Sequence, residues 1–371
     1  MPGEEFLIGK LKERTQDLAL RVLQKQQEKI DFYSNDYLGL AGDRTFQEAI
    51  LHYIQRRHLS HGSTGSRLLS GNHDLFEQVE KRIADFHQAE AALIFNSGYN
   101  ANVGLLASIA GREEAIVYDS LIHASLRDGI RLSLAPAFSF FHNNLHHLED
   151  KLKRLHRRCF VVVESIYSMD GDQAPLESLI NLCKRHNAYL IVDEAHATGV
   201  AGDQGEGLVQ HLGLEKGCFA RVHTFGKALG VHGAAVVGSE VLKQYLVNYA
   251  RTFIYTTALP PASVAAIEMA YRHFPQMKAE RAHLQNLVAH FQAESLPFEK
   301  LSSQTPIQAI LTRGNKQARE LSDELQQHGL DIRPILYPTV PKGKERLRIV
   351  LHSFNTLEEL QQLMAVLRRM N

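Results

Sequence analysis

Short apolar runs alternate with amphipathic stretches through most of the chain. The runs FVVV at 160–163 and YLIV at 189–192 resemble strands of a parallel sheet that is covered on both faces. We predict strands at residues 91–95, 115–118, 138–141, 159–164, 189–193 and 221–224, and an antiparallel or edge strand at 234–238. Their alternation with helical periodicity predicts a doubly wound α/β fold, with a mostly parallel sheet and helices on both faces.

Both ends of the chain carry a different pattern. Residues 5–29 are charged and helix-prone, and a long helical stretch covers 261–291. The other predicted elements are a strand at 30–33, a Gly/Ser-rich loop at 61–71, a helix at 74–86, a strand at 307–311, a helix at 316–328, a strand at 346–351 and a helix at 357–370. We expect an N-terminal segment (1–45) that packs with a small α+β domain (275–371), and a large α/β domain (46–274).

Charge and cysteine content narrow the functional classes. The 371 residues include 41 Lys plus Arg and 41 Asp plus Glu, so no net field attracts nucleic acid or an acidic membrane surface. The three cysteines form no CxxC pair, which fits a reducing cytosol. The first residues lack the apolar segment of a secretory signal, and no run of about 18 uncharged apolar residues occurs. We expect a cytoplasmic protein that binds neither nucleic acid nor a membrane.

Reactive residue types follow four predicted strands, at the edge where ligands bind in open α/β sheets. These residues are Ser97, Gly98, Tyr99, Ser168, Asp193, His196, Thr224 and Lys227. Lys227 lies among small and apolar residues, and loss of hydration favours its neutral, nucleophilic form. A carboxylate at Asp193 suits a protonated ring nitrogen, and backbone N–H groups near Gly98 suit a phosphate. Together they predict a pyridoxal phosphate enzyme with a Schiff-base lysine.

Three other chemistries have partial signals. DEAH at 193–196 matches a helicase signature, but no upstream segment has the phosphate-loop form GxxxxGK[ST]. No GxGxxG follows the first strand, which argues against a nicotinamide enzyme. His142 and His146 have the i, i+4 spacing of metal ligands, but no acidic or cysteine partner completes a distinctive set. We expect a polar loop-to-helix junction there, and no metal.

Ordered motifs run through nearly the whole chain. They are SNDYLGL at 34–40, GSTGSR at 62–67, SGYNAN at 97–102, DSLIHAS at 119–125, ESIYSMDGD at 164–172, DEAHATG at 193–199 and VHTFGKALG at 222–230. On these motifs the chain resembles the α-oxoamine synthases. That resemblance implies a fold-type I pyridoxal phosphate enzyme that condenses an amino acid with an acyl thioester and releases CO2.

The resemblance also implies roles for the catalytic residues. Lys227 would carry the cofactor and later move the α-proton of the substrate. Asp193 would pair with the ring nitrogen, His123 would stack on the ring face, and His196 would hydrogen-bond the phenolic oxygen. Ser168 would contact the cofactor near the same oxygen.

Other implied contacts lie at the cofactor phosphate. Gly98 and Tyr99 would use main-chain groups, in the turn that begins at Ser97. Thr224 would add its hydroxyl group. Thr256 would reach the phosphate of a neighbouring subunit, because the family builds its sites at a dimer interface. The expected assembly is therefore a homodimer with shared active sites.

Substrate contacts are implied near both ends of the chain. The segments PTVP and RLRI most resemble the family members that join L-alanine to a pimeloyl thioester. Arg346 and Arg348 share one face of a predicted strand, a guanidinium suits the alanine carboxylate, and the resemblance favours Arg348. Thr339 and Asn35 would lie near the substrate, and Arg21 would contact the acyl chain.

Two alternatives stay open. One is a sister member of the family that uses glycine or serine instead of alanine. The other is a non-catalytic subunit of a condensing complex, against which the joint presence of Lys227, Asp193 and His123 argues. The sequence also leaves open whether the acyl carrier is coenzyme A or a carrier protein.

Overall fold

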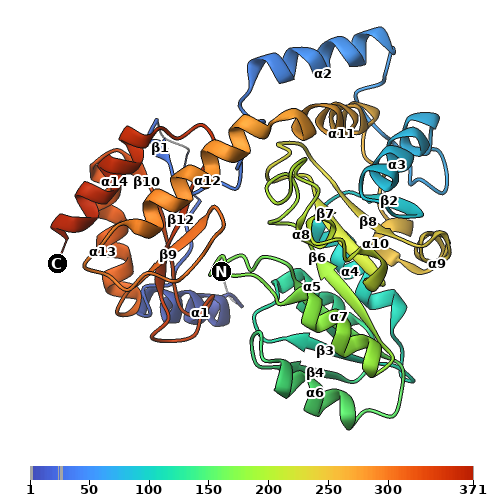
Figure 1. Cartoon of the computed structure of the whole chain (residues 1–371), viewed down its shortest axis with the longest axis horizontal. Coiled ribbons are helices and arrows are strands. Elements are labelled where there is room, and N and C mark those ends of the chain that lie inside the picture. Colours follow the sequence, from blue (N-terminus) through green and yellow to red (C-terminus); the bar gives the residue numbers. More distant parts are fainter. Residues whose placement is uncertain (1–2, 24, 26–27, 371) are drawn as a thin grey trace. The chain divides into compact units, whose positions relative to one another are not determined.

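The computed structural model describes residues 3–23, 25 and 28–370, which form two compact units (Figure 1). The large unit comprises Leu38–Ser168 and Gln173–Arg281. The small unit comprises Met1–Tyr37, Met169–Asp172 and Ala282–Asn371. Helix α12 (Lys278–Ala293) contributes residues to both units.

The large unit is built on a mostly parallel sheet, as predicted. Its strands are β2 (Ala91–Phe95), β3 (Ala115–Asp119), β4 (Ala137–Phe140), β5 (Cys159–Glu164), β6 (Ala188–Asp193), β7 (Ala220–Thr224) and β8 (Ala234–Gly238). Their order is β2-β8-β7-β6-β5-β3-β4, and all neighbours are parallel except those of β8. Each strand lies within one residue of its predicted bounds. Strand β8 is antiparallel but internal, so the alternative of an edge strand is wrong.

The large unit also contains helices, several of which pack on this sheet. They are α2 (Arg44–Arg56), α3 (Asp74–Phe86), α4 (Gly98–Ile109), α5 (Ala124–Leu132), α6 (Leu145–Lys153), α7 (Leu176–Arg185), α8 (Leu208–His211), α9 (Glu240–Tyr249), α10 (Arg251–Ile254) and α11 (Pro261–His273). Helix α4 packs against β7 and β8, α7 against β6, and α6 against β3 and β4. Every residue of β5 is buried, which explains why its sequence is apolar on both faces.

Two predicted helical stretches are shorter than expected. The stretch at 261–291 is divided by a 3₁₀ turn at Phe274–Gln276, because Pro275 cannot donate the next helical hydrogen bond. The N-terminal helix α1 (Glu5–Gln16) ends where Leu18 takes a left-handed φ of 53°. The predicted helix at 5–29 is therefore wrong beyond α1, and its residues 24, 26 and 27 lie outside the described residues.

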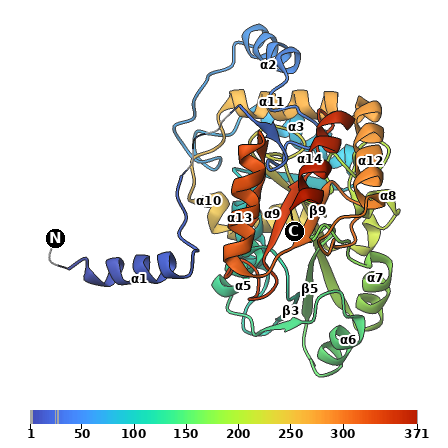
Figure 2. The same cartoon turned by 90° about the vertical axis from the view of Figure 1, so that its left-hand side faces the viewer.

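The small unit combines a short sheet with helices. Besides α1 it contains β1 (Ile30–Asp31), β9 (Ile307–Leu311), α13 (Gly314–Gln327), β10 (Leu330–Asp331), β11 (Arg333–Ile335), β12 (Arg346–Val350) and α14 (Leu357–Arg369). Strands β11, β12 and β9 form an antiparallel sheet in that order, and β1 pairs with β10. Helix α13 packs against β11 and β12. It also contacts α14, which lies beside it in Figure 2. The predicted strand at 30–33 is confirmed only for β1.

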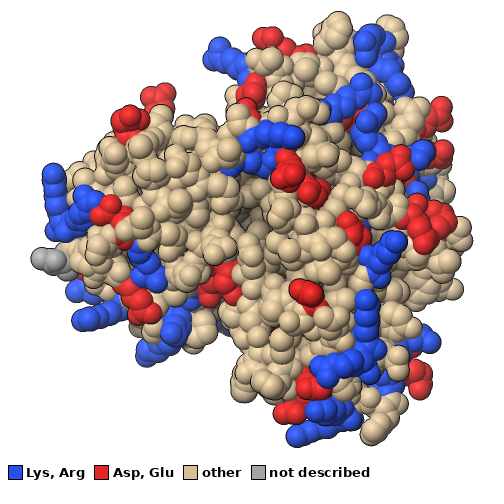
Figure 3. All heavy atoms as spheres, viewed as in Figure 1, with Lys and Arg blue, Asp and Glu red and all other residues tan. Residues whose placement is uncertain are grey.

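Acidic and basic side chains are intermixed on the face of the molecule that Figure 3 shows. Figure 3 shows both signs side by side, in agreement with the equal numbers of the two kinds of residue. Among the residues that the structure describes, no helix is both long enough and apolar enough to cross a membrane.

Candidate active site

The turn between β7 and β8 holds the predicted reactive lysine. Phe225 begins this turn with a hydrogen bond from its N–H to the Gly233 carbonyl, 3.0 Å away, and its side chain is fully buried. Ala228 and Leu229 are also buried, so the apolar neighbours anchor the turn. The Lys227 Nζ atom lies 2.8 Å from Nε2 of His196, within hydrogen-bond distance. The structure thus brings together two predicted catalytic residues from the ends of neighbouring strands.

Asp193 is the last residue of β6, and its carboxylate is almost completely buried. Its Oδ1 accepts a hydrogen bond from the Ala195 N–H at 2.9 Å, and its Oδ2 accepts one from Asn102 Nδ2 at 2.7 Å. Asn102 was not among the predicted site residues. The available signal was a polar residue in the SGYNAN segment at the start of α4.

His123 caps the N-terminus of α5 and lies near Asp193. Its Nδ1 is 2.8 Å from the Ser125 hydroxyl oxygen, and its backbone N–H donates to Glu164. Loss of water around the imidazole lowers the pKa of His123, and the negative charge of Asp193 opposes that shift. Burial, reinforced by the Asp193 carboxylate, raises the pKa of Glu164 to about 8. Both pKa shifts favour the neutral forms of His123 and Glu164 beside Asp193.

The N-terminus of α4 forms a second part of the site. The Ser97 hydroxyl caps this helix by accepting from the Asn100 N–H at 3.2 Å. A Cβ atom at Gly98 would lie 2.3 Å from the Thr224 hydroxyl oxygen, so only glycine lets the hydroxyl approach the helix end. The Thr256 hydroxyl is 3.1 Å from Asn96 Nδ2, directly before Ser97. Helix N–H groups and hydroxyls together suit a phosphate.

For two further predicted cofactor contacts, Ser168 and Tyr99, the structure shows where each residue lies. Ser168 is buried after β5, close to the isolated bridge between Ile166 and Gln173. The Tyr99 hydroxyl donates a hydrogen bond to Asp128 of α5, with 2.9 Å between the two oxygen atoms. The side chain of Tyr99 is thus engaged with α5, and its backbone N–H is the group expected at the phosphate.

These residues fit pyridoxal 5'-phosphate. The large unit offers a lysine amine, a buried carboxylate, a histidine at the N-terminus of α5, and a glycine helix terminus next to a threonine hydroxyl. Those groups match the aldehyde carbon, ring nitrogen, ring face and phosphate of that cofactor.

The predicted substrate residues all lie in the small unit. Arg348 donates to Asn35 Oδ1 at 2.9 Å, and Arg21 donates to the Thr339 hydroxyl at 3.2 Å. Arg346, on the same face of β12 as Arg348, instead forms an ion pair with Asp170. The carboxylate of Asp170 thus neutralises Arg346, which leaves Arg348 as the better candidate for a substrate anion.

Two of the predicted substrate residues line a cavity of about 530 Å³ in the small unit. Arg21 and Thr339 line it together with apolar side chains such as Leu20 and Leu336. Further guanidinium groups come from Arg14, Arg319 and Arg333. The cavity therefore combines an apolar lining with positive charge.

His142, one of the two histidines considered as metal ligands, has another partner. His142 pairs with Asp119 at 2.9 Å, and Asn144 caps α6 by accepting from the His147 N–H at 2.9 Å. Within the described ranges, no group of three His, Cys, Asp or Glu side chains has a geometry that could hold a metal ion.

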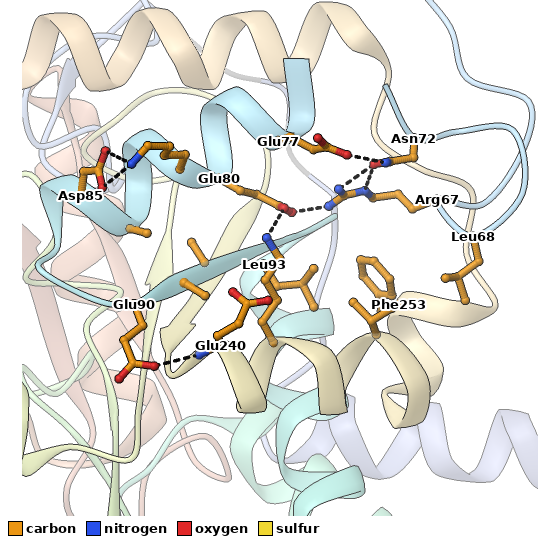
Figure 4. A pocket seen from close by; sticks show the side chains of 16 residues that line it. Arg67, Leu68, Asn72, Glu77, Glu80, Asp85, Glu90, Leu93, Glu240 and Phe253 are labelled. Carbon is orange, nitrogen blue, oxygen red and sulfur yellow. Dashed lines mark hydrogen bonds and ion pairs between the residues drawn. The ribbon is translucent and has the colours of Figure 1, made fainter. Parts of the chain in front are cut away.

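Another cavity, of about 490 Å³, lies in the large unit and is lined in part by Arg67 and Leu68 of the Gly/Ser-rich loop (Figure 4). The buried carboxylate of Glu80 pairs there with Arg67 of this loop and with Lys243, the latter at 3.0 Å. The Arg67 guanidinium also stacks 4.0 Å from the ring centre of Phe76. These charges satisfy one another, so we assign the network to anchoring the loop on α3.

Glu194 makes the stability of the fold depend on pH. It is fully buried, and its Oε1 accepts from the Leu208 N–H at 3.0 Å. Burial raises its pKa from 4.5 to about 7, against the opposing effects of the Ser165 hydroxyl and Arg221. Between these pH values the folded chain binds more protons than the unfolded chain, so the free energy of unfolding falls as pH rises.

We therefore predict that Glu194 destabilises the fold by up to about 3 kcal/mol more at pH 8 than at pH 4.5. Urea denaturation of the wild type and Glu194→Gln at both pH values measures this difference. Other titrating groups cancel in the comparison. An equal stability difference at the two pH values would contradict the prediction.

Comparison with known sequences places these features in a family. The family model described as aminotransferase class I and II matches residues 27–367. A Geobacillus kaustophilus relative called putative 8-amino-7-oxononanoate synthase is 43% identical over 336 residues, which cover 89% of this chain and 86% of the relative. The 8-amino-7-oxononanoate synthase of Emericella nidulans is 42% identical over 363 residues, with coverages of 90% and 87%.

Solved structures show the same architecture. The 8-amino-7-oxononanoate synthase of Francisella tularensis has a TM-score of 0.79 and 31% identity, covering 93% of this chain and 98% of its own. Serine palmitoyltransferase from S. paucimobilis, solved with PLP and myriocin, has a TM-score of 0.89 and 26% identity, with coverages of 99% and 96%. The predicted fold-type I architecture is confirmed, and the chain belongs to the aminotransferase class I and II family.

Proposed function

We propose that this protein condenses L-alanine with a pimeloyl thioester to give 8-amino-7-oxononanoate, CO2 and the free thiol carrier. This reaction belongs to biotin biosynthesis, and we place it in the cytoplasm, as the sequence predicts. The observation that carries the proposal is the arrangement of Lys227, Asp193 and His123 at or just after the ends of strands β7, β6 and β3 of one sheet, in a chain whose relatives bear that enzyme's name.

The cofactor of this reaction is pyridoxal 5'-phosphate. When bound, it supplies an electron sink that stabilises negative charge at Cα of an amino acid. Asp193, held by Ala195 and Asn102, keeps a positive charge at the ring nitrogen. Gly98 and Thr224 hold the phosphate, and His123 covers the ring face.

Lys227 is the proposed general base and acid. Its Nζ takes the Cα proton of alanine and later returns a proton to the same carbon. His196 keeps the amine oriented through their 2.8 Å hydrogen bond. Arg348 binds the alanine carboxylate, for which its planar guanidinium is suited.

The bond changes balance without another reactant. A bond forms between Cα of alanine and the thioester carbonyl carbon as the carbon–sulfur bond breaks, and the thiol carrier leaves. The alanine carboxyl group then departs as CO2, and a proton returns to Cα.

The acyl chain is assigned to the cavity that contains Arg21 and Thr339. Its apolar side chains suit the methylene groups of a pimeloyl chain, and its guanidinium groups suit a terminal carboxylate or the phosphates of a carrier. The carrier is coenzyme A or a carrier protein, and both present phosphate groups that such a cavity can attract.

We also propose that two copies assemble as a homodimer with shared active sites. Support comes from apolar side chains on the surface of the large unit, including Leu69 at 85% and Tyr255 at 72% exposure. Changing both to glutamate (Leu69→Glu, Tyr255→Glu) should shift the assembly from the mass of two chains to that of one. Light scattering measures this, and an unchanged mass would contradict the assignment of this surface.

The proposed function is tested by pairing alanine, glycine and serine with pimeloyl, acetyl, succinyl and palmitoyl thioesters. We expect alanine with the pimeloyl thioester to give the highest kcat/KM, with products identified by mass spectrometry. Preference for glycine would indicate 2-amino-3-ketobutyrate ligase or 5-aminolevulinate synthase chemistry, and preference for serine a sphingolipid-type enzyme. A chain that binds no cofactor and forms no product would be a non-catalytic subunit.

A further inference from the structure

One buried asparagine on α4 connects two residues of the proposed cofactor site. Asn102 is 2% exposed, and its Nδ2 lies 2.7 Å from Asp193 Oδ2 and 3.0 Å from the Ser125 hydroxyl oxygen. That hydroxyl oxygen lies 2.8 Å from Nδ1 of His123. A continuous chain of hydrogen bonds therefore runs from the carboxylate to the imidazole.

The direction of each hydrogen bond follows from one backbone group. The Ser125 N–H can only donate, and it points at His123 Nδ1 from 3.2 Å, so Nδ1 is an acceptor. The Ser125 hydroxyl, beside the same nitrogen, can then only donate to it. Its oxygen accepts in turn from Asn102, whose remaining amide hydrogen donates to Asp193. The proton of the neutral imidazole is left on Nε2.

The orientation of the Asn102 amide is fixed by the same logic. A rotated amide would place Oδ1 against the Asp193 carboxylate, where two acceptors repel each other. In the observed orientation Oδ1 is buried and has no hydrogen-bond partner among the described residues. A buried acceptor without a partner is uncommon in proteins. The Asn102 amide therefore donates both of its hydrogens, to Asp193 and Ser125, while its oxygen accepts no hydrogen bond from the described residues.

We propose that Asn102 is a positioning residue of the active site, an inference that rests on the proposed function. It orients the Asp193 carboxylate toward the ring nitrogen. Through the Ser125 hydroxyl it also reinforces the neutral tautomer of His123 with its proton on Nε2, which the backbone N–H of Ser125 favours. The Nε2–H group is then a fixed hydrogen-bond donor of the imidazole.

Two variants separate the proposed role of Asn102 at Asp193 from its role at His123. Asn102→Ala removes both donors, whereas Ser125→Ala breaks the connection to His123 and keeps the hydrogen bond to Asp193. Asn286→Ala, at an exposed asparagine of α12, is the matched control. Circular dichroism and thermal melting establish that each variant is folded.

The first measurement is the affinity of the apo chain for pyridoxal 5'-phosphate, followed by absorbance. We expect Asn102→Ala to weaken it about 10- to 100-fold, as for loss of a hydrogen bond to a charged group. Ser125→Ala should retain most of the affinity, and Asn286→Ala all of it. If Asn102→Ala binds the cofactor as tightly as the wild type, its proposed role at Asp193 is wrong.

The second measurement is the tautomer of His123, from the ¹⁵N shifts of histidine-labelled full-length chain with and without cofactor. The His123→Asn spectrum assigns the signal. We expect a proton on Nε2 in the wild type, and a partial shift toward the tautomer with its proton on Nδ1 in Asn102→Ala and Ser125→Ala, because the backbone N–H of residue 125 then acts on Nδ1 without an oriented hydroxyl donor. A wild-type proton on Nδ1, or variants identical to the wild type, would overturn the connection through Ser125. Because the apo chain reports the tautomer without cofactor, this result is independent of whether the proposed reaction occurs.

Discussion

Replacing Lys227 with alanine is expected to abolish the condensation, with a loss of at least about 10⁴-fold in kcat. The Nζ atom is the only proposed group that both carries the cofactor and moves the Cα proton. No other amine is assigned to the turn between β7 and β8, and His196 would lose its 2.8 Å partner. Mass spectrometry of the 8-amino-7-oxononanoate formed measures the loss.

Borohydride labelling separates this chemical role from a structural one. In the wild type, reduction should fix the cofactor to the peptide that contains Lys227, and the variant should carry no label there. Lys184→Ala, at an exposed lysine of α7, is the control and should retain wild-type labelling and turnover. Wild-type turnover in Lys227→Ala would refute the assignment.

Replacing Asp193 with asparagine should reduce kcat by at least about 100-fold while the fold is retained. The two side chains have nearly the same shape, but a neutral amide cannot stabilise a positive charge at the ring nitrogen. Asn102 can still donate to an amide oxygen at position 193, so the local packing survives. Steady-state turnover measures the loss, and thermal melting measures stability.

The exchange of α-hydrogen in alanine gives a second measure of the Asp193 effect. The rate at which deuterium from solvent enters alanine should fall together with kcat, because both depend on stabilised charge at Cα. Asp203→Asn, at an exposed aspartate, should leave both rates unchanged. An Asp193→Asn enzyme with normal exchange would show that the carboxylate is not at the ring nitrogen.

The parallel strands and the proposed catalytic residues at their carboxyl ends could be predicted, because both follow from the local sequence. Strand β5 is buried along its whole length, so its sequence is apolar at nearly every position. Lys227 and Asp193 interrupt apolar surroundings at the ends of such strands. The carboxyl ends of parallel strands lie at one edge of a sheet, so these residues could be placed together without knowledge of the contacts.

The contacts that refine the site were not predictable because they join distant parts of the chain. Asn102 and Asp193 are 91 residues apart, and nothing in either segment specifies the other. The same holds for Arg346 and Asp170. Their ion pair distinguishes Arg346 from Arg348, although the two arginines look equivalent in the sequence. The N-terminal helix was predicted too long because its apolar residues have helical spacing, yet no residue of α1 is buried.

Isotope tracing tests the central claim most directly. Purified protein is supplied with pimeloyl thioester and alanine labelled with ¹³C at Cα and at the carboxyl carbon, and the products are analysed by mass spectrometry. We predict that 8-amino-7-oxononanoate retains the Cα label and that an equal amount of labelled CO2 is released. Labelled CO2 without the condensed product, or condensation that retains the carboxyl carbon, would contradict a decarboxylative condensation of alanine.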